Sequence, residues 1–156
     1  MGQAMTARGL AVLAAAGSAA LLLGAFAFQY IGGLAPCPMC LWQRWPHGVA
    51  ILAGVMILAI PGRIWPIIGA AAAGTTGAIG VFHTGVERGW WQGPSTCTSG
   101  PIGDLTPQQL MDSILSAPLV RCDEVAWQMW GLSMASWNAV LSLALMAIWL
   151  AAARRA

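Results

Sequence analysis

The sequence contains no lysine and only five acidic residues, too little charge for the surface of a soluble domain of this length. Charged residues make up 8% of the 156 positions and apolar residues 58%, with a mean hydropathy of +0.71. No basic run indicates a nucleic-acid partner, and the net charge of +2 says little about other partners. These absences predict a single membrane domain over residues 1–156.

Four apolar segments fill most of the chain. A helix needs roughly 20 apolar residues to cross about 30 Å of hydrocarbon; three segments meet this directly, and the second meets it if its helix begins near Pro38. We therefore expect an all-α fold, an integral membrane four-helix bundle. The expected spans are about 10–29, 41–60, 64–83 and 132–153, with outer loops at about 30–40 and 84–131.

The loop charges predict the orientation of the bundle. Four arginines lie on one side if the chain crosses four times: Arg8, Arg63, Arg154 and Arg155. The long loop on the other side contains all five acids: Glu87, Asp104, Asp112, Asp123 and Glu124. Positive-inside counting then places both termini in the cytoplasm, by a margin of four arginines to three.

All four cysteines fall on the outer side under this topology: Cys37, Cys40, Cys97 and Cys122. Four cysteines allow three pairings, and local geometry favours Cys37 with Cys40, which leaves Cys97 with Cys122. Two structural disulfides are one interpretation. A zinc site lacks a second close pair, so we predict no metal, and covalent haem is excluded because Leu41 follows the C-x-x-C motif. That spacing is typical of dithiol redox chemistry.

The stretch "APCPMCLWQRWP" adds a helix start and a cation to the dithiol. Pro38 suits the first helical turn, which would place Cys40 among free backbone N–H groups at the positive helix end. Arg44 follows four residues later on the same face. It either extends to the lipid headgroups or holds an oxygen-bearing electron acceptor. Pro46 would kink or interrupt this helix.

The long outer loop contains a second helix signal. Thr106 is suited to an N-cap, Pro107 to the first helical position and Gln109 to the third. We expect a short amphipathic helix there, which either lies on the membrane surface or packs against a partner. Glycine, proline and serine around Cys97 predict a mobile, accessible segment.

Three further polar residues have weaker signals. His83 ends the third span near the expected level of Arg44, so it either contacts a bound ligand or is an ordinary interfacial residue. His47 has a weaker signal still. Glu87 is expected to be a solvated loop acid rather than a proton carrier.

The motifs together resemble the DsbB family of bacterial disulfide-bond formation proteins. The matching stretches are "PCPMCLWQR", "GVERGWWQGPSTC" and "RCDEVAWQMWGLSMASWN", which occur in family order. The resemblance implies a bacterial inner-membrane oxidoreductase that reoxidises a periplasmic thioredoxin-like protein, DsbA, and passes electrons to ubiquinone or menaquinone.

The resemblance also implies residue roles. Cys97 would form the mixed disulfide with the partner, Cys122 would attack Cys37, and Cys40 would pass electrons to the quinone. Arg44 matches the family arginine near the quinone, whereas His83 has no secure motif match. Two alternatives remain: a protein like vitamin K epoxide reductase, whose C-x-x-C belongs at the last core span, and a membrane scaffold with static disulfides.

Overall fold

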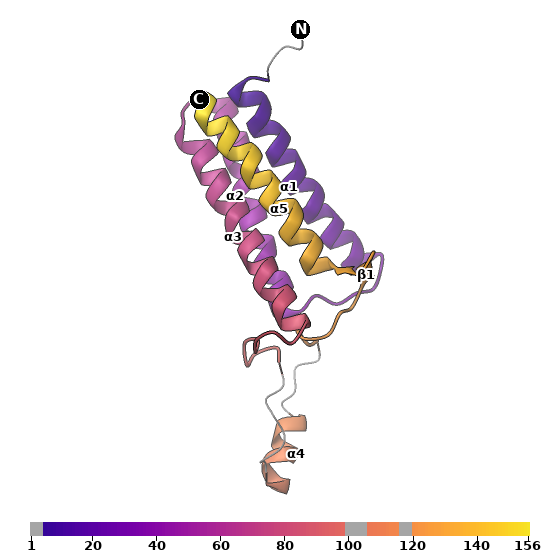
Figure 1. The fold of residues 1–156 in the computed structure, drawn as a ribbon. Coiled ribbons are helices and arrows are strands. Elements are labelled where there is room, and N and C mark those ends of the chain that lie inside the picture. Colours follow the sequence, from indigo (N-terminus) through magenta and orange to yellow (C-terminus); the bar gives the residue numbers. More distant parts are fainter. Residues whose placement is uncertain (1–4, 99–105, 116–119) are drawn as a thin grey trace.

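A computed structural model describes residues 5–98, 106–115 and 120–156, and four long helices dominate it. Their bounds are α1 Ala7–Tyr30, α2 Pro38–Ala59, α3 Ile64–Glu87 and α5 Met134–Arg155. α3 packs against α2 and α5, and α1 packs against the same two helices from the other side (Figure 1). Asp104, one of the predicted loop acids, lies outside the described residues.

Local sequence signals explain where three of these helices begin. The side chain of Thr6 accepts a hydrogen bond from the Gly9 N–H at the start of α1, and Ser133 accepts one from the Ser136 N–H at the start of α5. Each satisfies a backbone donor that has no partner within the helix. α2 begins at Pro38, as the sequence predicts.

Pro46 does not interrupt α2, which continues to Ala59. Proline has no N–H to donate to the carbonyl of the preceding turn, but the helix tolerates this single loss. Cys40 and Arg44 therefore share one helical face and line the same cavity.

Small residues allow the helices to approach closely near the chain termini. A Cβ atom on Gly54 of α2 would lie 2.3 Å from the Cβ of Ala15 in α1, so only glycine fits at this crossing. Close approach through small residues is how membrane helices gain packing energy. The buried cluster at this end contains Ala11, Ala14, Ala15, Ala53, Ile57, Ala70, Ala73, Trp149 and Ala152.

Three of the long helices are long and apolar enough to cross a membrane: α1, α3 and α5. α2 has 22 residues but is not among them. Its first turns contain Gln43, Arg44 and His47, and the side chains of Gln43 and His47 are buried inside the protein. An average over the whole helix therefore includes polar groups that would not face lipid, and a fourth span stays a prediction.

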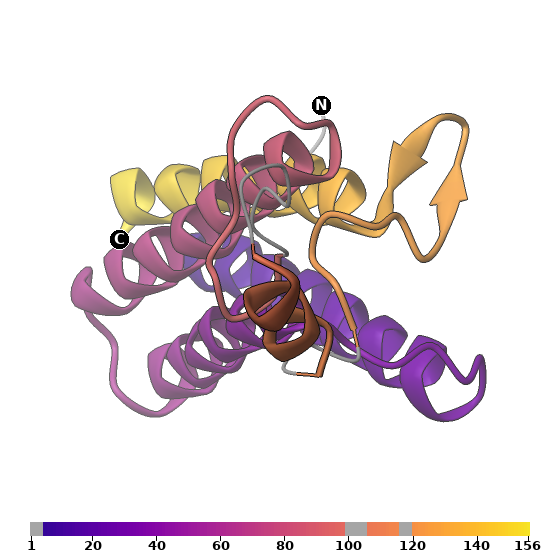
Figure 2. The same ribbon diagram turned by 90° about the horizontal axis from the view of Figure 1, so that it is seen from below.

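Two elements differ from a simple bundle. β1 (Gln128–Met129) and β2 (Leu132–Ser133) form an antiparallel hairpin where the sequence predicts only loop and helix. Both turn residues, Trp130 and Gly131, have positive φ, as a two-residue hairpin turn requires. Seen from below, the hairpin lies to one side of the bundle, next to the start of α5 (Figure 2).

The short helix α4 covers Pro107–Leu115, and its start has the predicted cap. The Thr106 backbone N–H donates to Gln109 Oε1 at 2.9 Å, and the Gln109 N–H donates back to Thr106 Oγ1 at 3.4 Å. Met111 and Leu115 are exposed, while the side chains of Leu110 and Ile114 lie outside those described. A position on a membrane surface remains a prediction.

Both termini and the connection between α2 and α3 lie at one end of the bundle (Figure 1). The opposite end carries the connection from α1 to α2 and the segments that follow α3 and precede α5. The four cysteines belong to these latter segments and to the first turn of α2. The chain therefore separates its termini from its cysteines by the full length of the bundle.

Candidate functional site

The four cysteines form two pairs in different states. Cys97 and Cys122 are joined by a disulfide, with their Cα atoms 5.3 Å apart. Cys37 and Cys40 are free thiols whose sulfur atoms lie 2.7 Å apart, beyond the bond length of about 2.05 Å in a disulfide. The pairing of Cys97 with Cys122 agrees with the prediction, and Cys37 and Cys40 are close enough to form the other pair.

The sulfur of Cys37, rather than that of Cys40, caps α2. It accepts a hydrogen bond from the Cys40 backbone N–H at 3.2 Å, so this donor at the helix start points to the sulfur of Cys37 rather than to that of Cys40. The cause is position, because Cys37 is the N-cap residue and Cys40 lies within the first turn. The hydrogen bond with Cys40, together with burial, raises the pKa of the Cys37 thiol above its ordinary value.

Cys97 is fully buried, which corrects the expectation of an accessible segment. Its N–H donates to the Pro94 carbonyl at 3.0 Å, and its own carbonyl accepts from the Cys122 N–H at 2.7 Å. Thr98 adds side-chain bonds to the carbonyls of Gly93 and Pro94. Glycine and proline therefore shape an ordered turn here, because the backbone groups that they expose find partners within the turn.

The two cysteine pairs meet at His83. The sulfurs of Cys37 and Cys122 and a ring nitrogen of His83 all lie within 4.8 Å of one another, and all three residues are buried. The disulfide is thus adjacent to the free dithiol, as a transfer of the disulfide between pairs requires. In this state Cys122 is not a thiolate, so the three residues do not form a complete ligand set for a metal.

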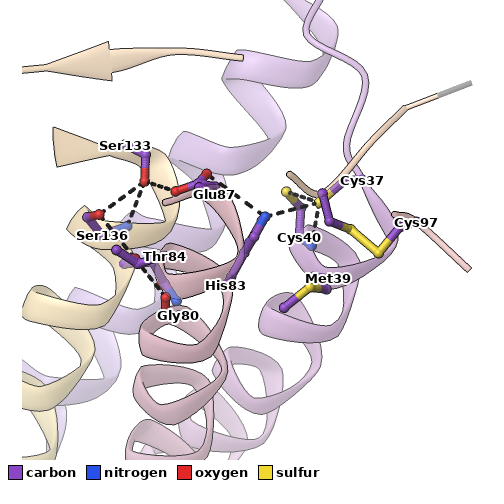
Figure 3. Close-up of polar contacts among 12 residues, drawn as sticks. Cys37, Met39, Cys40, Gly80, His83, Thr84, Glu87, Cys97, Ser133 and Ser136 are labelled. Atoms are coloured by element: carbon purple, nitrogen blue, oxygen red, sulfur yellow. Dashed lines mark hydrogen bonds and ion pairs between the residues drawn. A yellow bond between two sulfur atoms is a disulfide. The ribbon is translucent and has the colours of Figure 1, made fainter. Parts of the chain in front are cut away.

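His83 has a defined partner on each side of its ring. Nδ1 lies 3.0 Å from the side-chain nitrogen of Gln43. Nε2 lies 3.7 Å from the sulfur of Cys37 (Figure 3). The carboxylate of Glu87 is 3.9 Å from Nε2. The ring therefore lies at the centre of the site rather than at an interfacial helix end.

A cavity of about 500 Å³ adjoins the dithiol and extends between α1, α2 and α5. Its walls are mainly apolar by area, and the polar residues that line it include Cys40, Arg44, His83 and Glu87. The Arg44 guanidinium donates to the Gln29 side chain and lies over the Phe26 ring, with 5.0 Å between its central carbon and the ring centroid. Its buried Nε has no partner within the described protein, so one donor remains free for a ligand.

The side chain of Glu87, at the end of α3, is only 7% exposed, which corrects its expected place as a solvated loop acid. Its carboxylate accepts a hydrogen bond from the Ser133 hydroxyl. The hydroxyl oxygens of Ser133 and Ser136 lie 3.1 Å apart, and the Thr84 hydroxyl lies 3.1 Å from that of Ser136 (Figure 3). The hairpin and the start of α5 therefore cover Glu87, an arrangement that only the tertiary contacts create.

Sequence reasoning missed a network of buried and half-buried polar side chains below the site. The Asn138 side chain donates to Gln43 Oε1 at 2.7 Å and to Thr76 Oγ1 at 3.1 Å, and His47 Nε2 lies 2.9 Å from Asn138 Oδ1. The available signal was the presence of polar residues within otherwise apolar spans, which are costly there unless they have partners. These hydrogen-bonded side chains link α2, α3 and α5 directly beneath His83.

Comparison with known proteins places these features in a family. The profile of the family described as "Disulfide bond formation protein DsbB" matches residues 7–152. Disulfide bond formation protein B of Stutzerimonas stutzeri is 29% identical over 152 residues, covering 91% of this chain and 93% of that protein. The Pasteurella multocida protein of the same name is 33% identical, covering 80% and 74%.

A third relative, disulfide bond formation protein B of Paracidovorax citrulli, is 31% identical over 96% of this chain and 90% of its own length. No solved structure gives a significant match. The profile match covers α1, α2, α3, most of α5 and all four cysteines. The chain therefore belongs to the DsbB family of disulfide bond formation proteins.

Proposed function

We propose that this protein is a thiol oxidase of the bacterial inner membrane that reoxidises a periplasmic thioredoxin-fold partner of the DsbA type. The electrons would pass to a membrane quinone, ubiquinone or menaquinone. The observation that carries the proposal is the contact of two cysteine pairs: the Cys122 sulfur lies within 4.8 Å of Cys37, whose own neighbour Cys40 lines an apolar cavity.

The relay begins at the Cys97–Cys122 disulfide. A partner thiolate attacks the Cys97 sulfur, a mixed disulfide forms, and Cys122 leaves as a thiolate. Cys122 then attacks Cys37 in the state in which Cys37 and Cys40 are joined, so a Cys37–Cys122 bond forms and Cys40 leaves as a thiolate. Because Cys97 is buried, the turn formed by residues 93–98 must open before the partner can reach it.

The residues around the cavity fit a quinone. A bound quinone would supply an acceptor for two electrons and two protons. The apolar walls suit a lipid-soluble ring, and the unpartnered Nε of Arg44 offers a buried donor to an oxygen atom. His83 also lines this cavity, while its Nε2 faces Cys37, and its contact with the quinone stays a prediction.

A periplasmic position of the cysteines follows from the proposed topology. The termini and the connection between α2 and α3 share one end, as four crossings require (Figure 1). Arg63, Arg154 and Arg155 belong to that end, and positive residues favour the cytoplasmic side. Four spans are then needed, with α2 crossing as part of the bundle.

A quinone-reduction assay tests the proposal. Purified protein, a reduced thioredoxin-fold partner and a short-chain ubiquinone or menaquinone should give quinol formation that depends on all three components. The Cys40→Ser variant should lose this activity while it keeps the Cys97–Cys122 disulfide, which is verified by mass spectrometry after alkylation. Absence of quinone reduction by the wild-type protein would leave the static scaffold as the better interpretation.

A further inference from the structure

The side-chain amide of Gln43 defines the tautomer of His83. The Gln43 nitrogen donates to the Met39 carbonyl at 3.2 Å and lies 3.0 Å from His83 Nδ1. A carbonyl oxygen only accepts, so the Gln43 atom between these two groups is the NH2 group. His83 Nδ1 must therefore accept a hydrogen bond, and the ring proton of neutral His83 resides on Nε2.

Asn138 holds Gln43 in this orientation from the other side. Its side-chain nitrogen donates to Gln43 Oε1 at 2.7 Å, and the same nitrogen lies 3.1 Å from Thr76 Oγ1. Turning the Gln43 amide over would bring its oxygen against the Met39 carbonyl and its nitrogen against the Asn138 donor. Gln43 is also only 6% exposed, so water does not offer it alternative partners.

The proton on Nε2 lies close to the sulfur atoms that react, with the Glu87 carboxylate 3.9 Å from the same nitrogen. Nε2 lies 3.7 Å from the sulfur of Cys37, within the range of a hydrogen bond to sulfur. The sulfur of Cys122 is within 4.8 Å of the same group. The Nε2–H of His83 therefore lies next to the two sulfur atoms between which the Cys37–Cys122 bond would form and break.

We propose that Gln43 is a positioning residue that holds His83 in the Nε2–H tautomer, so that His83 donates to the Cys37 sulfur as it separates from Cys122. The inference rests on the proposed function for the place of this step in the cycle. After a Cys37–Cys122 bond has formed, the observed Cys97–Cys122 disulfide returns only if Cys97 attacks Cys122 and displaces Cys37. His83 then assists the departure of Cys37.

The step balances without an outside oxidant. The Cys97 thiolate attacks the Cys122 sulfur, the Cys97–Cys122 bond forms, and the Cys37–Cys122 bond breaks. Cys37 leaves with the electron pair as a thiolate, so one thiolate is consumed and one is produced. A hydrogen bond donated to the departing sulfur lowers the free energy of the thiolate and therefore the pKa of the thiol. A leaving thiol of lower pKa departs faster.

Other titratable groups surround Cys37 and must be held constant in any test. Cys40 and Arg44 contribute from α2, while α3 contributes His83 and Glu87. Arg121 and Glu124, from the segment before β1, line the adjoining cavity. A change at Gln43 can act through its own charge as well as through His83, so the experiment needs a background without the histidine.

The first measurement determines the tautomer by ¹⁵N NMR on protein labelled at its histidine rings. The chain has only two histidines, so the His83→Phe variant assigns the signals. Wild-type protein should show a protonated Nε2 and an unprotonated Nδ1 at His83. Gln43→Glu places an acceptor beside Nδ1 and should move the proton to Nδ1, whereas Gln92→Glu, the same change at an exposed position, should leave it on Nε2.

The second measurement titrates Cys37 by thiolate absorbance in a Cys40→Ser background, where Cys37 is the one free thiol while the disulfide is closed. Gln43→Glu should raise the midpoint of the Cys37 titration by about one pH unit. At a pH below the midpoint, the thiolate fraction would then be about tenfold lower. His83→Phe should give a similar shift. Adding Gln43→Glu to His83→Phe should then change little, because the first effect acts through the histidine.

Three results would overturn the inference: a proton on Nδ1 in wild-type protein, a tautomer that Gln43→Glu leaves unchanged, or the same Gln43→Glu shift with and without His83. If Gln43→Glu does not fold, the wild-type tautomer and the His83→Phe titration still decide. Neither measurement uses a partner or a quinone. A failed quinone-reduction assay would therefore reject the proposed function and leave the tautomer result standing.

Discussion

Near the chain termini α1 packs tightly against α2, whereas near the cysteines the same helix lines a cavity. Gly54 and Ala15 make the tight crossing, and Trp149 fills the space between the helices beside them. Further along α1, Gly24 and Ala25 border the open space beside Arg44 instead. Small residues thus serve two purposes, since they allow contact where a partner approaches and leave room where none does.

Polar groups differ between the two halves in the same way. The cluster near the termini is built of alanine, isoleucine and tryptophan, while the cysteine end buries Gln43, His83 and Glu87 with hydrogen-bond partners. Buried polar groups are costly unless they are satisfied. The half near the termini therefore contributes apolar packing, whereas the half near the cysteines buries polar groups, at a cost in stability, to form a reactive site.

Removal of Cys122 should have the largest effect, because it breaks the relay at the cysteine end. We expect Cys122→Ala to reduce quinone reduction to the uncatalysed rate. Mild oxidation with a partner that retains only its attacking cysteine should trap a mixed disulfide at Cys97, since Cys122 is missing and cannot displace it. Peptide mapping by mass spectrometry locates the bond; capture at Cys37 would contradict the assigned roles.

Arg44→Met tests the cavity in the same half. Loss of a charged donor should raise the KM for a short-chain quinone about tenfold to hundredfold, because hydrogen bonds to charged groups are among the stronger ones. Arg88→Met is the matched control, since Arg88 lies over the Trp90 ring and does not line the cavity. Equal KM values for both variants would remove Arg44 from the quinone site.

The tight half can be tested by adding one methyl group. In Gly54→Ala the new Cβ would overlap Ala15, and we expect a loss of about 1–3 kcal/mol in the free energy of unfolding in detergent. Gly48→Ala in the same helix meets nothing within 4 Å and should gain about 0.5–1 kcal/mol. If both variants behave alike, close packing at Gly54 is not what stabilises this half.

The smallest effect is expected from the half-exposed charges beside Cys122. Arg121 donates two hydrogen bonds to Asp123, at 2.9 and 2.6 Å, and holds the pKa of that carboxyl below its ordinary value. A lowered pKa means that this stabilisation is present above the unfolded-state pKa and is lost as the pH falls through the folded one. Asp123→Asn should therefore slightly lower stability at pH 7 and flatten its acid dependence in denaturant titrations.

Much of the architecture was predictable from residues close together in the chain. Pro38, Thr106 and Ser133 stand at helix starts because capping depends on neighbours within three or four residues. The C-x-x-C spacing and Arg44 one turn later identify the dithiol and its cation in the same local way. The hairpin before α5 was missed, because two-residue strands leave almost no alternating pattern in the sequence.

The content of the site was less predictable. The sequence suggests an accessible Cys97 and a solvated Glu87, and both are buried. Gln43 and Asn138 carry no local signal of function, yet they are joined by a hydrogen bond across 95 positions of the chain. Composition reports what a segment contains, but it does not report which distant segment will cover it.

The sequence by itself determined an apolar helical protein with two cysteine pairs and its resemblance to one family, because hydropathy, caps and motif spacing act over short stretches of chain. Only the tertiary structure decided that Cys37 caps α2, that the disulfide lies against it, and that Gln43 sets the proton of His83. These features depend on α2, α3, α5 and the segment around Cys122 meeting at distances of a few ångströms, where burial removes water as a competing partner.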